Sequence, residues 1–118
     1  MYICCMLSTE LLKGTLTPII LKLLDENGEM YGYEITHKVK ELSGGKILVK
    51  EGSLYPALHK LLDDGLVSVR TVNIGNRVRK YYYLTKKGKT KKDKHFGELY
   101  EFLNVIYKIV FPKLKPLV

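Results

Sequence analysis

Residues 51–65 carry the sequence EGSLYPALHKLLDDG, which has the apolar spacing of a short amphipathic helix. Its leucines are spaced by four, three and one residues, so they form one stripe that we expect to pack against a core. The N-cap is expected at Gly52 and Ser53, Pro56 in the first turn, and the end of the helix at Gly65. The stripe consists of Leu54, Leu58, Leu61 and Leu62.

The opposite face of this helix has a different chemistry. Four residues lie opposite or beside the leucines, and they are aromatic, neutral or basic. An anion that meets the first half of the helix would find the amides of Gly52 and Ser53, the positive end of the helix dipole and no carboxylate. The pattern indicates a recognition helix for DNA, while an ordinary helix with a solvated polar face is the alternative. The outward residues are Tyr55, Pro56, His59 and Lys60.

A basic β-hairpin is predicted directly after this helix. Residues 66–74 and 77–84 are rich in Val, Ile, Thr and Tyr, and Gly75 with Asn76 forms a two-residue turn signal between them. A helix followed by such a hairpin is the layout of a winged helix-turn-helix, in which the helix enters the major groove and the wing holds the neighbouring backbone. Phosphate contacts are expected from Arg77, Arg79 and Lys80. The tyrosines at 81–83 are interpreted as packing residues.

Several short motifs also occur in order along the chain. They are residues 12–16 with 20–24, 31–35, 52–61, 64–67 and 79–85. In order and spacing they resemble the motifs of PadR-type transcriptional regulators, from about Leu11 to Gly88. The resemblance implies a homodimeric repressor with a winged helix-turn-helix and a C-terminal dimerisation helix. The short tail resembles the smaller branch of the family, which has a single such helix.

The expected fold is mainly α with a small β-wing, an α+β arrangement. The chain has 118 residues, of which 46% are hydrophobic and 27% charged, as in a soluble globular protein. Residues 1–85 are assigned to a winged helix-turn-helix DNA-binding domain. Residues 86–118 are assigned to the C-terminal dimerisation helix and tail, so that the two parts form one compact unit.

Positive charge is concentrated in the second half of the chain. Residues 1–68 contain seven Lys or Arg against nine Asp or Glu, whereas residues 69–118 contain thirteen against three. The positive field therefore lies on the wing and on the C-terminal residues after it, which favours an acidic partner such as DNA. Binding to RNA or a membrane surface, or a simple role in solubility, are the alternatives.

Two helices and a further strand are expected before residue 51. Residues 9–24 form a single helix kinked at Pro18, or else a helix that begins with Thr17 as N-cap and Pro18 as its first residue. Residues 25–28 are a turn. Residues 31–43 form a second helix with Leu42 facing inward, and residues 47–49 add a third strand beside the wing.

The C-terminal part combines a basic stretch with an apolar seam. Residues 86–94 are interpreted as a solvated helix start or linker, with a second DNA contact as the alternative. The next apolar residues recur at three- and four-residue spacing, and too few charges lie among them for exposure on a monomer, so a homodimer is expected. The predicted interface is Phe96, Leu99, Phe102, Leu103, Ile106, Ile109 and Val110.

An enzyme is the least favoured class, because no nucleophile lies near a base and no metal-ligand spacing or phosphate-binding glycine loop occurs. Cys4 and Cys5 are interpreted as small apolar residues, with redox sensing as the alternative. No cofactor, metal or membrane span is expected, and the expected location is cytoplasmic.

The expected partners are double-stranded operator DNA, a second copy of the chain, and a small aromatic or hydrophobic effector. Phe96, Tyr100 and Phe102 are candidates for an aromatic effector pocket, although an ordinary dimer seam would use the same residues. The absence of Trp argues against stacking of planar drugs on a tryptophan at the dimer centre. The alternative function is a protein-interaction dimer that uses a winged scaffold without reading DNA.

Overall fold

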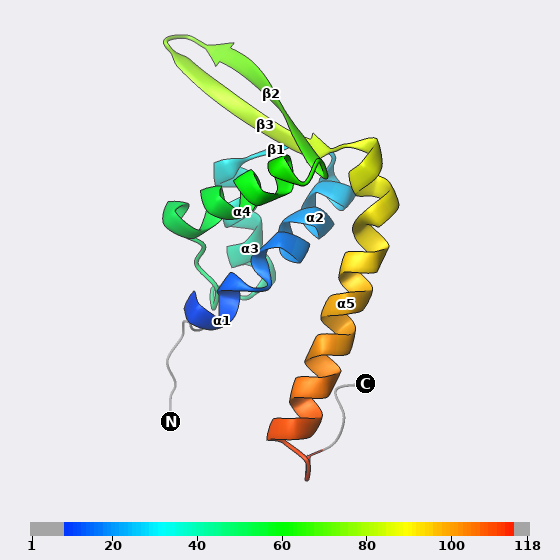
Figure 1. Cartoon of the computed structure of the whole chain (residues 1–118). Coiled ribbons are helices and arrows are strands. Elements are labelled where there is room, and N and C mark those ends of the chain that lie inside the picture. Colours follow the sequence, from blue (N-terminus) through cyan, green and yellow to red (C-terminus); the bar gives the residue numbers. More distant parts are fainter. Residues whose placement is uncertain (1–8, 115–118) are drawn as a thin grey trace.

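The computed structural model describes residues 9–114, and Cys4, Cys5 and Pro116 lie outside this range. Within it the chain is mainly helical with a small antiparallel sheet, so the predicted fold class is confirmed (Figure 1). The helices are α1 (Thr9–Lys13), α2 (Leu16–Asn27), α3 (Gly32–Leu42), α4 (Glu51–Asp63) and α5 (Lys86–Val110). The strands are β1 (Met30–Tyr31), β2 (Val67–Ile74) and β3 (Arg77–Leu84).

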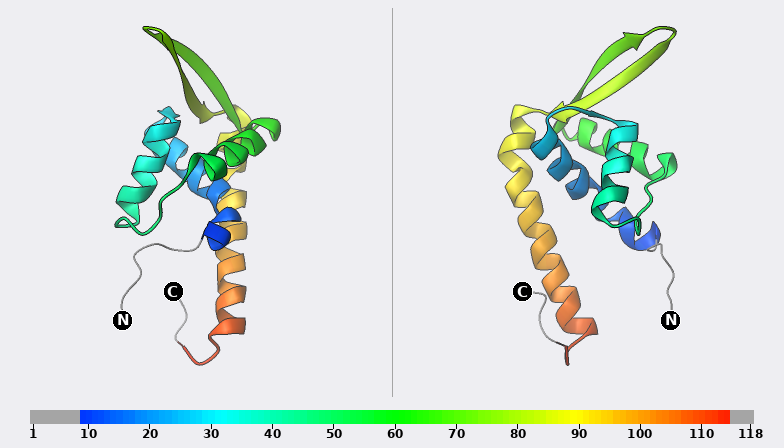
Figure 2. Two further views of the ribbon diagram at one scale, coloured as in Figure 1. Left: turned by 90° about the vertical axis from the view of Figure 1, so that its left-hand side faces the viewer. Right: turned by 180° about the vertical axis from the view of Figure 1, so that it is seen from behind.

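Helices α2, α3 and α4 enclose the core, and the β2–β3 hairpin and α5 extend beyond this helical group at opposite ends (Figures 1 and 2). The described part measures 56 × 35 × 21 Å, because both extensions are long. We call residues 67–84 the wing. The largest fully buried side chains are Leu16, Ile20, Leu21, Leu24, Ile35, Leu54, Leu58 and Leu61.

The prediction of one kinked helix over residues 9–24 is wrong, because the chain forms two helices. Thr15 breaks the first one, and both its amide and its hydroxyl donate hydrogen bonds of 3.0 Å to the carbonyl of Leu12. Helix α2 then begins at Leu16, which places Pro18 in the first turn, where a missing N–H costs little. The alternative start at Thr17 was close, but two residues too late.

The boundaries of the next two helices also differ from the prediction. Helix α2 continues through the predicted turn to Asn27 and ends at Gly28, whose φ of 84° is left-handed. Helix α3 ends at Leu42, whose side chain is 67% exposed instead of facing the core.

The sheet has the strand order β1-β3-β2, with both pairs antiparallel. The predicted hairpin is confirmed, and Gly75, with a φ of 61°, begins its two-residue turn. The predicted third strand at 47–49 is wrong, because Met30 and Tyr31 take the open edge of β3. Residues 47–49 are irregular, and Val49 contributes to the core by its buried side chain.

A dense joint connects the end of α4 to the start of α5. The hydroxyl of Thr85 donates to the Gly65 carbonyl at 2.6 Å and accepts from the Gly88 amide at 3.0 Å. The Thr85 amide donates to the carbonyl of Leu66 at 3.0 Å. The ammonium group of Lys87 donates to the carbonyl of Asp64 at 2.8 Å. The basic stretch 86–94 is therefore the start of α5, as the preferred interpretation expected.

Candidate nucleic-acid interface

The two predicted faces of α4 are confirmed. Leu54, Leu58 and Leu61 are buried, and Leu62 is half-buried against the same core. On the opposite side, all four predicted outward residues are exposed. The face made by Tyr55, Pro56, His59 and Lys60 is therefore available to a partner.

The start of α4 differs from the prediction. The chain enters in extended conformation at Lys50, which is the N-cap, and the helix begins at Glu51. Gly52 and Ser53 are thus helical, and the amide of Ser53 donates to the Lys50 carbonyl at 2.9 Å, so it is not free for phosphate. The expectation of a helix start without a carboxylate is also wrong, because exposed Glu51 occupies the first turn.

The position of Pro56 is a consequence of this earlier start. Pro56 lies inside α4 instead of in its first turn, and the residue four places before it is Gly52. A proline ring clashes with the carbonyl of that residue and leaves it without its helical N–H donor. A β-carbon at Gly52 would find no atom within 4 Å, so the helix is open to solvent at this point.

The end of α4 has the predicted glycine. Gly65 has a φ of 74°, its amide donates to Leu62, and the amide of Leu66 donates to Leu61, which together form a Schellman motif. Near this end Lys60 lies 3.6 Å from Asp64, so this candidate base contact has a carboxylate partner one turn away.

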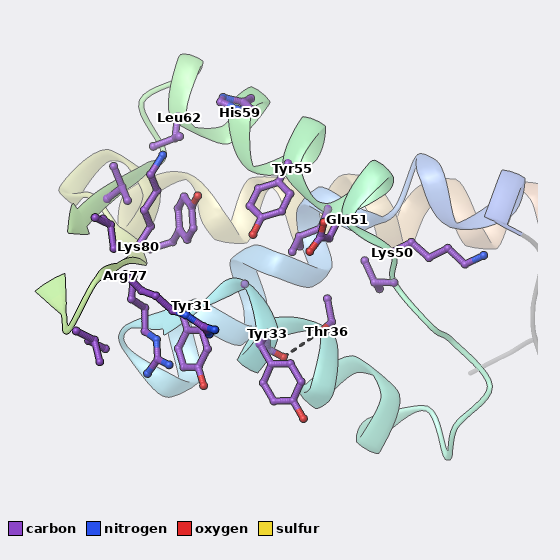
Figure 3. A pocket seen from close by; sticks show the side chains of 18 residues that line it. Tyr31, Tyr33, Thr36, Lys50, Glu51, Tyr55, His59, Leu62, Arg77 and Lys80 are labelled. Carbon is purple, nitrogen blue, oxygen red and sulfur yellow. Dashed lines mark hydrogen bonds between the residues drawn. The ribbon is translucent and has the colours of Figure 1, made fainter. Parts of the chain in front are cut away.

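An open hollow of about 880 Å³ lies between α4, the wing and the start of α3. Figure 3 shows that α4 and the wing form two sides of it and that Tyr31, Tyr33 and Thr36 come from the third. The hollow thus brings together predicted residues from two separate parts of the sequence. The predicted residues that line it are Tyr55, His59, Arg77, Arg79 and Lys80.

The wing residues differ in how they are held. Arg77 and Lys80 are exposed near the tip. Arg79 is half-buried, with its guanidinium 4.1 Å from the centre of the Tyr31 ring, and a side-chain hydrogen bond with Tyr81 raises its pKa. Arg77 and Lys80 are therefore the exposed wing cations of this hollow, whereas Arg79 is engaged on an aromatic face.

Sequence reasoning missed the third side of the hollow. Tyr33 is 67% exposed on the first turn of α3, its ring stacks on that of His37, and Lys50 and Glu51 line the opposite side. In the sequence, the motif at 31–35 supports only the family resemblance. The helical spacing of Tyr33, Thr36 and His37, all polar or aromatic on one side, was the signal for an outward face.

Comparison with known proteins places this arrangement in a family. Residues 20–94 match the sequence model of the transcriptional regulator PadR-like family, which is more than half of the chain. The chain belongs to the PadR family.

Known regulators match the chain over different lengths. It is 42% identical over 71 residues to the negative transcriptional regulator PadR of Bacillus subtilis, but spans only 38% of that protein's length. A transcriptional regulator from Clostridium thermocellum superposes with a TM-score of 0.75 at 30% identity, covering 88% of this chain and 98% of that one. The structure of Bacillus subtilis PadR in complex with operator DNA superposes with a TM-score of 0.61 at 38% identity, covering 69% of this chain and 46% of that one.

The PadR family is one of transcriptional regulators, which agrees with the prediction that the chain is not an enzyme. Within residues 9–114 no helix is long and apolar enough to cross a membrane. The same residues contain no group of three or more His, Cys, Asp or Glu side chains suited to a metal ion.

The second candidate surface of this PadR protein is the apolar side of α5. Phe96 packs against the chain's own core, with the Lys22 ammonium 5.8 Å from its ring centre, and Leu99 is half-buried. Further along the helix the apolar side chains are exposed. Those of the predicted interface are Phe102, Leu103, Ile106, Ile109 and Val110.

A groove of about 580 Å³ continues from this surface between α5 and the helical group. Its lining is almost entirely apolar and includes Leu42, the leucine that the sequence had placed in the core. Of the three aromatic candidates for an effector pocket, Phe96 and Tyr100 line the groove and Phe102 does not.

Proposed function

We propose that the chain is a homodimeric transcriptional repressor that binds a near-palindromic operator through α4 and the wing. The observation that carries this proposal is the shared hollow. Tyr55 and His59 on the outward face of α4 line the same space as the exposed cations of the wing, although His59 and Arg77 are eighteen positions apart in the sequence. A duplex that lies across this side of the molecule meets base-reading and phosphate-binding groups together.

The two parts have different tasks in this proposal. His59 and Lys60 donate to guanine acceptors in the major groove, and Tyr55 contacts a phosphate oxygen or a thymine methyl group. Arg77 and Lys80 bind phosphates beside the groove and set the orientation of the protein on the duplex. Glu51, in the first turn of α4, would repel a phosphate, so the backbone must pass it at a distance.

The exposed end of α5 supports the homodimer. Apolar side chains that continue over two helical turns form a larger patch than a soluble monomer usually leaves open. The proposal requires this pairing to hold two α4 helices on one side of the dimer, about 34 Å apart for successive major grooves.

Repression is proposed from a relative, and its relief from the groove beside α5. The Bacillus subtilis relative is named a negative transcriptional regulator, and repression is our proposal for this chain on that similarity. A small aromatic or hydrophobic effector would enter the groove between α5 and the helical group and favour a dimer geometry that no longer fits the operator.

The central experiment compares operator and random DNA. Bound fragments are selected from random duplexes, and binding is then measured by fluorescence anisotropy at fixed salt. His59→Ala should weaken operator binding more than binding to random DNA, whereas His95→Ala, which removes an imidazole from α5, should change neither. Equal losses on both duplexes would exclude His59 from base reading.

Salt dependence separates DNA binding from the alternative of a protein-interaction dimer. A protein that neutralises several phosphates loses affinity steeply as salt rises. A flat salt dependence, with no enriched sequence in the selection, would contradict the proposed function.

A further inference from the structure

An arginine crosses the outer face of the sheet and joins its two edges. Arg70 belongs to the edge strand β2, and Glu29 immediately precedes the opposite edge strand β1. The Arg70 Nε donates to Glu29 Oε2 at 2.9 Å and Nη2 donates to Oε1 at 2.8 Å. Between them lies the central strand β3, and the guanidinium packs 5.3 Å from the ring centre of Tyr81. We call Glu29, Arg70 and Tyr81 the strap.

A second contact of the same kind lies closer to the tip. Arg79 of β3 packs on the ring of Tyr31 in β1, and that ring meets Tyr81 edge-on with centroids 5.6 Å apart. The outer face of the sheet is thus an interlocked layer of arginine and tyrosine side chains. Each contact joins the wing to the segment between α2 and α3.

The strap lies where the three-stranded part of the sheet ends and the two-stranded part of the wing begins. Strand β1 pairs with β3 only at Tyr81 and Tyr82, and Arg70 pairs with Tyr81 from the other side. Beyond this point the backbone of the hairpin pairs only with itself among the described residues, as far as Arg77 and the turn, while the Arg79 side chain still packs on the ring of Tyr31. A change of angle at the strap would therefore be magnified at the tip.

The charge of Glu29 points to a positional role. A carboxylate near a DNA-binding surface repels phosphates, and this one also occupies the Nε–Nη2 edge of an arginine that could otherwise bind DNA. The Arg70 hydrogen bonds lower the pKa of Glu29, so the pair stays ionised at neutral pH. Electrostatics alone would make Glu29 unfavourable for binding.

We propose that Glu29 and Arg70 are positioning residues that hold the wing at the angle at which Arg77 and Lys80 reach the DNA backbone. This inference rests on the proposed function, since it concerns how the same hollow binds DNA. It goes beyond it by assigning a role to two residues that do not line the hollow.

The decisive variant is Glu29→Gln. A purely electrostatic effect of Glu29 and a positional role predict opposite changes in DNA affinity for it. Removal of a negative charge should tighten DNA binding if Glu29 has no positional role. The proposal expects affinity to fall, by about two- to fivefold, the range of a well-formed exposed ion pair. Unchanged or tighter binding by Glu29→Gln at fixed salt would overturn the proposal.

A second measurement reports on the wing without DNA. The chain has no tryptophan, so Asn76→Trp places a single reporter in the turn of the wing. Time-resolved anisotropy of this residue should show a larger fast component when Glu29→Gln or Arg70→Gln is added. Arg77→Gln is the matched control, because it removes a charge near the tip and should reduce the salt slope by about one without loosening the turn. An unchanged fast component in the strap variants would also overturn the proposal.

A charge exchange tests the pair itself. The double variant Glu29→Arg with Arg70→Glu should recover most of the affinity and stiffness that either single variant loses, and failure to recover would contradict a direct pairing role. If the unaltered protein binds no DNA, the proposed function fails, and the tryptophan measurement alone then decides whether the strap sets the wing.

Discussion

Gly88 in α5 lies so close to the carbonyl oxygen of Leu66 that a β-carbon on the glycine would overlap that oxygen. Leu66 comes just after the end of α4, and Gly88 is in the first turn of α5, so this approach fixes the angle between the two helices. The neighbouring Thr85 hydrogen bonds form only if the approach is preserved.

Substitution of Gly88 by Ala should therefore be strongly destabilising. The clash is with backbone, which cannot move aside as a flexible side chain does, and we expect the free energy of unfolding to fall by about 3 kcal/mol or more. Gly97→Ala is the control in the same helix, because a β-carbon there meets no atom within 4 Å. It should raise the stability by up to about 1 kcal/mol through helix propensity. Similar urea midpoints for both variants, at one protein concentration, would refute the close approach.

Thr85→Ala should destabilise the same joint by a different route. It removes the N-cap of α5 and the donor to the Gly65 carbonyl, and together these losses should cost about 1–2 kcal/mol in urea unfolding. Thr90→Ala is the matched control, because that hydroxyl is exposed and bonds only to the Lys86 carbonyl within the helix. Its effect should stay below about 0.5 kcal/mol. A larger loss at Thr90 than at Thr85 would contradict the assigned role of the cap.

Periodic signals predicted the parts of the fold that depend on one segment alone. The leucines of α4 and the arms of the hairpin were correct, because each pattern is fixed by the spacing of side chains on one face. The prediction of the third strand was wrong, because this strand depends on which segment reaches the open edge of β3. Residues 47–49 have the more strand-like composition, yet Met30 and Tyr31 pair with β3 after the tight turn at Gly28.

The candidate site was also predicted only where a local sequence pattern marks its residues. His59 and Lys60 are predictable from helical periodicity, and Arg77 and Lys80 from their place beside the turn. Glu51 was misplaced because the Gly52-Ser53 pair has the composition of an N-cap, whereas the chain enters the helix at Lys50, and a propensity for capping does not reveal where the incoming chain bends. The strap could not be predicted from the sequence, because Glu29 and Arg70 are forty-one positions apart and no local pattern pairs them.

The apolar end of α5 gives a test of the homodimer. Ile109 is 69% exposed in the single chain, so Ile109→Glu should leave the monomer folded but place a charge in the proposed interface. We expect the variant to sediment as a monomer at concentrations where the unaltered protein is a dimer. Lys108→Glu, at the neighbouring position, changes the net charge by more than Ile109→Glu does. Because Lys108 is exposed and outside the proposed interface, this variant should leave the dimer largely intact. A dimer that is equally stable in both variants would exclude this surface.

Acidification should release the strap in a defined pH range. The Arg70 hydrogen bonds lower the pKa of Glu29 below its ordinary value of 4.5, so the pair adds stability above that value and loses it as pH falls through the lower pKa of the folded state. Glu29 also lines a separate hollow of about 430 Å³ together with the charged residues Glu34, His37, Lys38 and Glu41, which are the same in both proteins. The difference between the unaltered protein and Glu29→Gln removes their contribution to first order. We therefore expect this difference in unfolding free energy to be constant from neutral pH down to about pH 5, and to shrink steadily below that. A difference that grows on acidification would mean that Glu29 is protonated more easily in the folded state, and that Arg70 does not hold it.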